Sequence, residues 1–90
     1  MRTATTERPL NGGIQRIYRF NNGRGASVVK HKFSHGNEKG LWELAVIKFE
    51  ENKNNFDFNL DYSTPITSDV LGRLTENEID GLLAKIEALP

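Results

Sequence analysis

Apolar residues recur at two different spacings in this chain, and the change of spacing divides it into two parts. Between residues 14 and 62 they form short runs that are either alternating or continuous, whereas after residue 75 they recur every three or four positions. The first spacing is typical of β-strands and the second of an amphipathic α-helix. The pattern therefore predicts an α+β fold in which the strands come first and a helix follows.

The most apolar stretch runs from Gly40 to Phe49 and contains Trp42, the single tryptophan. A strand that is apolar on both faces belongs inside a structure, because the edge of a half-exposed sheet would leave one face in water. Two strands are predicted before it, at residues 14–20 and 26–33. The segment Asn21–Gly25 between them contains residues that adopt positive φ angles in tight turns, so these two strands should form an antiparallel hairpin.

Residues 56–62 alternate strictly between apolar and polar side chains. This pattern predicts a fourth strand with one dry and one wet face. Four successive strands joined by short loops favour a four-stranded antiparallel β-meander over about residues 14–62. The dry face would consist of Phe56, Phe58, Leu60 and Tyr62, and the wet face of Asp57, Asn59 and Asp61.

The last part of the chain predicts an α-helix over about residues 76–88. Thr75 and Glu78 have the spacing of a capping box, and Leu74 and Ile79 that of a hydrophobic staple. A short helical turn is expected before them, at residues 68–72. One apolar stripe of the helix should pack across one face of the sheet, through Ile79, Leu82, Leu83, Ile86 and Leu89.

Residues 1–13 show no periodic apolar pattern and contain Pro9. We therefore expect a flexible N-terminal tail, followed by a single α+β domain over residues 14–90. No second helix is predicted for the other face of the Trp42 strand. Two alternatives remain for covering it: strong curl of the sheet together with the tail, or another molecule, such as a second copy of the chain in a homodimer.

The composition is that of a small soluble protein. With 90 residues and no cysteine, the chain forms one domain at most and has no disulfide. No apolar run approaches the roughly 20 residues of a membrane span, and the N-terminal residues do not resemble a signal peptide. We therefore expect a cytoplasmic protein with no membrane partner.

Charge is distributed unevenly although the net charge is zero. Residues 1–39 contain eight basic and two acidic side chains, whereas residues 40–90 contain four basic and ten acidic ones. Neutralisation within the molecule, or plain solvation, is the simpler interpretation. The alternative is a basic surface on the predicted hairpin that contacts a partner or a nucleic acid, although a sequence pI of about 6.7 is low for a nucleic-acid-binding domain. Its candidate residues are Arg16, Arg19, Arg24, Lys30 and Lys32.

No motif for catalysis or cofactor binding is evident. His31 and His35 are four residues apart, a spacing that suits a metal only on a helix, and no third ligand accompanies them. Asp57 and Asp61 share the predicted wet face, where carboxylates are ordinary solvating groups. The glycines of Gly23–Gly25 precede a predicted strand rather than a helix, so they indicate a turn and not a phosphate loop. We therefore predict no catalytic residue, no metal and no cofactor, and a protein that is not an enzyme.

Four stretches of the sequence resemble a pattern in small bacteriophage- and prophage-encoded proteins: Gly25–Val29, Gly40–Val46, Thr64–Thr67 and Leu74–Glu76. The resemblance extends over about residues 14–89. These proteins have no established activity, so the resemblance implies no functional residue. It favours a non-enzymatic accessory protein in the cytoplasm of a bacterial host, with a host protein as its partner. The alternative is a small nucleic-acid-binding module that uses the basic hairpin.

Overall fold

The computed structural model describes residues 1–34, 36–50, 54–66 and 70–90. The predicted α+β class, with an antiparallel sheet and one C-terminal helix, is confirmed, but within these residues the sheet has six strands rather than four. In chain order the elements are β1 (Thr6–Leu10), β2 (Gly13–Arg19), β3 (Arg24–Lys30), the 3₁₀ helix η1 (Asn37–Lys39), β4 (Trp42–Phe49), β5 (Phe58–Leu60), β6 (Leu71–Leu74) and α1 (Glu76–Glu87).

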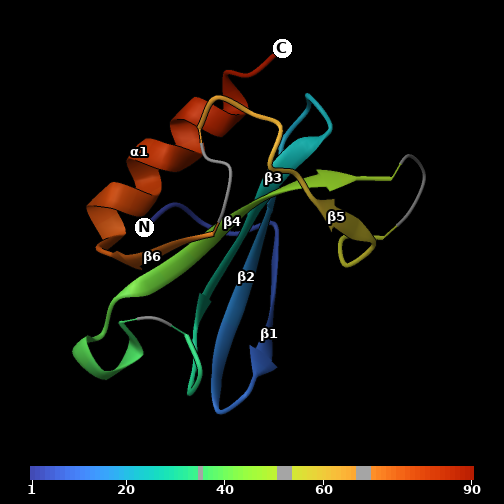
Figure 1. Ribbon diagram of the computed structural model, residues 1–90. Coiled ribbons are helices and arrows are strands. Elements are labelled where there is room, and N and C mark those ends of the chain that lie inside the picture. Colours follow the sequence, from blue (N-terminus) through green and yellow to red (C-terminus); the bar gives the residue numbers. More distant parts are fainter. Residues whose placement is uncertain (35, 51–53, 67–69) are drawn as a thin grey trace.

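The strand that contains Trp42, β4, is interior, as its two-sided apolar pattern predicted. The strand order is β1-β2-β3-β4-β5, and β6 also pairs with β4 (Figure 1). One edge of β4 is bonded to β3, and its other edge is shared by two short strands. β5 lies opposite Ile47–Phe49, and β6 lies opposite the first residues of β4.

The N-terminal residues belong to the sheet, which corrects the expectation of a tail over residues 1–13. β1 pairs with β2 in antiparallel register along its whole length. The residues between them, Asn11 and Gly12, have φ angles of 47° and 78°, as in the two-residue hairpin turns that Asn-Gly sequences favour. The apolar pattern does not indicate β1 because its three central residues are exposed, and Pro9 is tolerated at a sheet edge.

The segment after β4 is less regular than predicted. Of the strand expected over residues 56–62, only β5 pairs with β4. The predicted faces are also wrong at its end, where Leu60 and Tyr62 are 52% and 39% exposed and Asp61 is only 8% exposed. The reason is an ion pair: the Asp61 carboxylate lies 3.3 Å from Arg24 Nε, and this contact keeps Asp61 on the inside of the molecule.

β6 occupies part of the segment that was expected to form a helical turn at residues 68–72. Residues 68 and 69 fall outside the described residues, and the prediction is wrong for the part that β6 covers. Arg73 has a φ of 57°, which is uncommon for a residue with a Cβ atom, and the pairing of β6 with β4 is irregular. A bulged strand of four residues carries too little periodicity to be recognised in a sequence.

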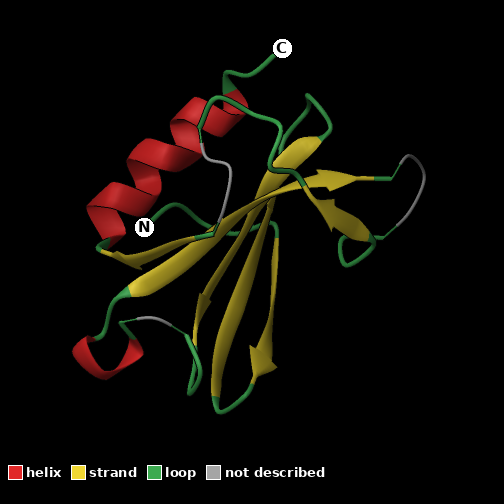
Figure 2. Cartoon of the chain, in the orientation of Figure 1, coloured by secondary structure: helices red, strands yellow, loops and turns green. Residues whose placement is uncertain are grey.

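The helix α1 packs across one face of the sheet, over β3 and β4 (Figure 2). Its predicted capping box is present: Thr75 Oγ1 accepts from the Glu78 N–H, and the Glu78 carboxylate accepts from the Thr75 N–H. Burial of the predicted stripe is complete at its centre. We call the resulting cluster the helix-side core; its buried members are Tyr18, Ala26, Val28, Trp42, Leu44, Val46, Leu74, Ile79, Leu83 and Ile86.

The turn between β2 and β3 holds the C-terminal end of α1. The side-chain amide of Asn22 donates to the carbonyls of Ile86, at 2.9 Å, and of Leu89, at 3.0 Å. Carbonyls at the end of a helix have no partner within the helix, so a donor from elsewhere stabilises them. The predicted turn therefore also fixes where the helix ends on the sheet.

Residues before β1 close the helix-side core between β2 and α1. The Tyr18 hydroxyl donates to the Arg2 carbonyl at 2.7 Å, and the Arg2 backbone N–H donates to Asp80 Oδ1 at 2.8 Å. Met1 and Ala4 pack against the core. Burial of Tyr18 raises the pKa of its phenol. The first residues are thus part of the packed structure.

Candidate functional site

The face of β4 that points away from α1 is dry, although no helix in the described part of the chain covers it. Ile17 and Ile47 are fully buried there, together with Phe49. Phe58 packs on Phe49 in an edge-to-face arrangement with 6.0 Å between the ring centroids. We call this smaller cluster the curl-side core. Something other than a helix must keep water away from it.

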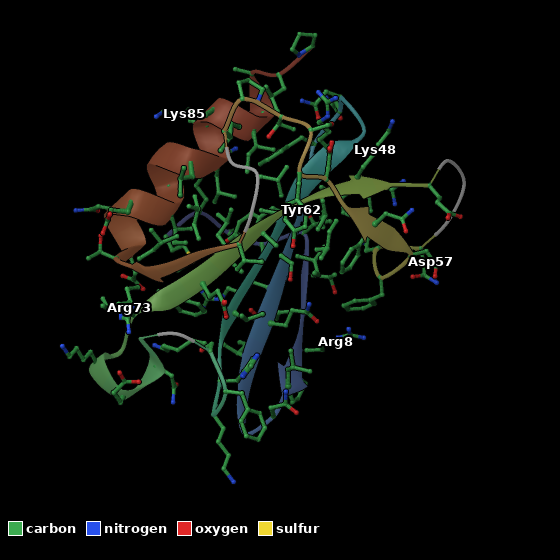
Figure 3. The ribbon with its side chains drawn as sticks, in the orientation of Figure 1. Arg8, Lys48, Asp57, Tyr62, Arg73 and Lys85 are labelled. Carbon is green, nitrogen blue, oxygen red and sulfur yellow. The ribbon has the colours of Figure 1, made fainter. Side chains whose placement is uncertain are left out.

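Curl of the sheet supplies that cover. β1 and β5 are at opposite ends of the strand order, yet the guanidinium carbon of Arg8 lies 4.3 Å from the ring centroid of Phe56, just before β5. Arg19, from β2, donates to Asn55 Oδ1 at 3.2 Å. In Figure 3, Arg8 lies on the side of β1 that faces β5. Of the two alternatives for this face, the structure therefore contains the curled sheet, with β1 in place of the tail.

A short polar network runs beneath the arginines. Arg8 Nε donates to Gln15 Oε1 at 2.7 Å, and Gln15 Nε2 donates to Ser27 Oγ at 2.9 Å. Gln15 and Ser27 are both buried, so each needs such a partner to offset the loss of water. The network also holds the Arg8 guanidinium in one position over Phe56.

Three large apolar side chains in and beside β5 remain partly exposed, and we call them the β5 rim: Phe56, Leu60 and Tyr62. They are 36%, 52% and 39% exposed. Leu60 lies directly opposite Ile47 in the register of β4 and β5, so its side chain is on the same face as the curl-side core. Leu60 therefore extends the curl-side core toward the surface, and Phe56 lies against Arg8.

The five basic residues predicted as partner contacts do not form one surface. Arg16 and Lys30 are on the helix side, where the Arg16 guanidinium carbon and Lys30 Nζ lie 5.1 and 4.5 Å from the Trp42 ring centroid. Arg19 is on the opposite face, 4.6 Å from the ring centroid of Phe49. The structure therefore brings together only Arg16 and Lys30, around Trp42.

Two of these basic residues are held by carboxylates. Arg16 Nε lies 3.4 Å from Glu7 Oε2, and Arg24 Nε lies 3.3 Å from Asp61 Oδ2. Both Nε groups are buried and neither is aligned for a hydrogen bond, so the contacts are Coulombic. Ser63 donates to Asp61 through its hydroxyl and its backbone N–H. These two hydrogen bonds, followed by Arg24, lower the pKa of the Asp61 carboxyl.

The uneven charge of the sequence is partly neutralised within the molecule. Of the four ion pairs among the described residues, three join the basic first part of the chain to the acidic second part. They are the pairs of the Met1 amine with Asp80, Arg2 with Glu87 and Arg24 with Asp61. This agrees with the simpler interpretation of the charge pattern.

Lys32 and Phe33 lie in a turn rather than in the predicted strand, because β3 ends at Lys30. Ser34 Oγ accepts from the His31 N–H at 2.9 Å, and the Phe33 N–H donates to His31 Nδ1 at 3.1 Å. Such local side-chain hydrogen bonds compete with strand pairing. We call residues 31–34 the Phe33 turn. The Phe33 ring itself is 71% exposed, which the sequence pattern does not indicate.

The residues singled out for chemistry are not assembled into a site. Asp57 is exposed while Asp61 is buried against Arg24, so the two carboxylates do not act together. His35 is outside the described residues. Among the residues that are described, no group of three or more potential metal ligands is found. A shallow groove lies between Pro65–Ile66 and the last turn of α1, and its lining is mainly apolar.

Comparison with known proteins finds no match: no family model fits this sequence, and no curated protein or solved structure is similar to it. Within the described part of the chain, no helix is long and apolar enough to cross a membrane. The functional argument therefore rests on the geometry of the surface.

Proposed function

We propose that this protein is a non-enzymatic accessory protein of the phage-encoded type it resembles, and that it binds a protein of a bacterial host. The observation that supports this proposal is the β5 rim. Phe56, Leu60 and Tyr62 fall within seven residues of one another, and each leaves more than a third of its surface in water. Single exposed apolar residues are ordinary, but a cluster of them is typical of an interaction surface.

The neighbours of the β5 rim also favour a protein partner. Arg8 lies over Phe56 and Arg19 over Phe49. Aromatic residues and arginine are enriched at the centres of protein–protein interfaces, where they contribute most of the binding energy. The combination on this face therefore matches the composition that such interfaces use.

Arg8, beside the β5 rim, already has its contacts before a partner arrives. Arg8 is held by Gln15 as well as by the ring of Phe56, so little side-chain freedom would be lost on binding. Pre-organisation of this kind raises affinity because it lowers the entropic cost of association. The same ordering limits the choice of partner to proteins whose surface complements a fixed shape.

Affinity capture with matched variants tests the proposal. The purified protein is immobilised and exposed to a bacterial lysate, in parallel with the double variant Leu60→Ala/Tyr62→Ala and with Phe33→Ala. We expect the wild type and Phe33→Ala to retain the same protein, and the double variant to lose it while remaining folded at the temperature of the assay. Phe33 is the matched control because it is another exposed apolar side chain on a different part of the surface.

Two outcomes contradict the proposal. In the first, the wild type and the double variant capture the same protein equally well, which would mean that the β5 rim is not the contact surface. The other is self-association: sedimentation of the purified protein as a dimer that Leu60→Ala/Tyr62→Ala dissociates would show that the rim binds a second copy of this chain instead.

A further inference from the structure

Phe33 is separated in the chain from the other large exposed apolar residues, and its ring lies against His31 and Lys32. In the described part of the chain, the remaining large hydrophobic side chains that are exposed by a third or more all belong to the β5 rim. Phe33 is the most exposed of the four, at 71%. An isolated ring cannot form the apolar centre of a protein interface, so its exposure needs a different explanation.

The Phe33 ring is presented on an ordered turn. The Phe33 N–H donates to His31 Nδ1, and the rings of His31 and Phe33 are in edge-to-face contact with 6.4 Å between their centroids. The Lys32 N–H donates to the carbonyl of Asn11 at 3.2 Å, which ties the Phe33 turn to the hairpin of β1 and β2. The backbones of the two segments lie very close together there, since a Cβ atom at Gly13 would be 2.0 Å from the carbonyl oxygen of Lys30. The ring is therefore held in place without being buried.

Three cations lie on the turn and on the segments next to it, and Lys32 Nζ is 5.8 Å from the centroid of the Phe33 ring. Lys32, Lys39 and Arg73 are exposed, and no ion pair is found for any of them among the described residues. Lys39 belongs to η1, whose first residue donates its N–H to the carbonyl of Ser34 at 3.3 Å. The only carboxylate in the described residues between 31 and 42 is Glu38. Within the described residues of this segment, basic side chains therefore outnumber acidic ones.

Arg73 is brought to the same end by the loop before η1. A Cβ atom at Gly36 would lie 3.0 Å from Arg73 Cα, and the φ of 86° at Gly36 suits glycine. Arg73 itself has the left-handed φ of 57°. Figure 3 shows it beside η1, away from Lys48 and Lys85. An exposed cation held in an unfavourable backbone conformation is a candidate for a binding role.

We propose that the Phe33 turn is a contact site for single-stranded nucleic acid. One base stacks on the ring of Phe33, and the neighbouring phosphates are bound by Lys32, Lys39 and Arg73. Exposed aromatic rings beside a cationic surface are the usual means of binding a single strand, because every base offers a face for stacking. A duplex is disfavoured, since its bases are already stacked on one another and unstacking them costs free energy.

This site is independent of the β5 rim. It shares no residue with that surface, and of the five basic residues predicted on the hairpin it uses only Lys32. Of the acidic residues on α1, Asp80 and Glu87 are held by the Met1 amine and by Arg2, whereas Glu76 and Glu78 follow Arg73 closely in the chain. Failure of either proposal therefore leaves the other standing.

Fluorescence anisotropy with a labelled oligodeoxythymidine and a labelled duplex of equal length tests this inference. At low salt we expect the single strand to bind more tightly than the duplex. Phe33→Ala should weaken binding by about 5- to 150-fold, which corresponds to the loss of one stacked base. Each of Lys32→Gln, Lys39→Gln and Arg73→Gln should lower the slope of log affinity against log salt by about 0.7.

Two matched variants serve as controls. Tyr62→Ala removes an exposed aromatic side chain, and Lys85→Gln removes an exposed lysine on α1; both should bind like the wild type. A variant is included only if its melting temperature is close to that of the wild type, so that a loss of binding does not reflect a loss of folding. No binding at low salt, equal binding of the duplex, or equal losses for Phe33→Ala and Tyr62→Ala would each overturn the inference. Binding to phosphatidylglycerol vesicles that Phe33→Ala abolishes, without binding of the oligonucleotide, would assign the turn to lipid instead.

Discussion

The two faces of β4 are closed in different ways. On one face, Trp42, Leu44 and Val46 meet the aliphatic stripe of α1. On the other, Ile47 and Phe49 are covered by Phe58 and by arginine side chains that reach across the curled sheet. The helix side is a conventional apolar core, whereas the curl side ends in exposed aromatic and basic residues. The first face therefore buries more apolar side chains, and the second carries the surface that we propose for binding.

The largest effect should come from removing residues 1–10. They supply β1, which carries Arg8, and the contacts of Arg2 with Tyr18 and Asp80. Both faces of β4 would lose cover, so we expect a loss of more than about 5 kcal/mol, which is the whole stability of a marginal domain. Circular dichroism during heating should then show no cooperative transition. An unchanged melting curve would mean that these residues are a tail after all.

Leucines on the two sides of the molecule give a matched pair. Leu83 is fully buried in the helix-side core, and Leu60 is 52% exposed on the β5 rim. Leu83→Ala should lower the free energy of unfolding by about 2–5 kcal/mol, whereas Leu60→Ala should lower it by less than about 1 kcal/mol because most of its surface already faces water. Chemical denaturation of the two variants measures both values. Equal losses of unfolding free energy in the two variants would contradict the view that the two faces of β4 are buried differently.

The ion pair between Asp61 and Arg24 should be smaller in effect and dependent on pH. Because the pKa of Asp61 is lowered in the folded state, its contribution is present above the unfolded pKa of about 3.9 and is lost as the pH falls through the folded pKa. At neutral pH, Asp61→Asn should cost about 1–3 kcal/mol, since it weakens hydrogen bonds to a charged group.

The difference between wild type and Asp61→Asn should therefore shrink when unfolding is measured at progressively lower pH below about 4. Asp57→Asn is the control, because Asp57 is exposed on the same segment and its substitution should leave stability within about 0.5 kcal/mol. A cost for Asp61→Asn that is the same at acidic and neutral pH would contradict the assigned role of the carboxylate.

The smallest effect should be the coupling of Arg8 with Phe56. A cation–π contact at a partly exposed site contributes about 0.5–1 kcal/mol. A double-mutant cycle with Arg8→Ala and Phe56→Leu should yield a coupling of that size, because the two side chains are in direct contact. The pair Arg8→Ala and Tyr62→Leu is the control, and its coupling should be near zero.

The sequence was informative wherever local chemistry decides the structure. Thr75 and Glu78 form the predicted capping box, and the turn at Asn21–Gly25 joins β2 to β3 as predicted. The Asn11-Gly12 turn carried a comparable signal for β1, but the exposed and Pro-containing strand before it has no apolar pattern to support it. Similarly, β6 is too short and too irregular to be recognised.

The candidate site could not be predicted because it depends on contacts between distant parts of the chain. Arg16 and Arg19 are close in sequence but lie on opposite faces of β2, and Arg24 is drawn to Asp61. The contact of Arg8 with Phe56 arises only once the sheet has curled. Periodicity identifies which residues share a face, and it does not indicate how strongly the sheet bends.

A nuclear Overhauser experiment shows whether the sheet bends in this way. We expect cross-peaks between the ring protons of Phe56 and the side-chain protons of Arg8, since the guanidinium carbon lies 4.3 Å from the ring centroid. These residues are far apart in sequence and belong to opposite ends of the strand order. If the Phe56 ring instead shows cross-peaks only to residues near it in sequence, the sheet does not curl over this face, and β4 depends on another molecule to cover it.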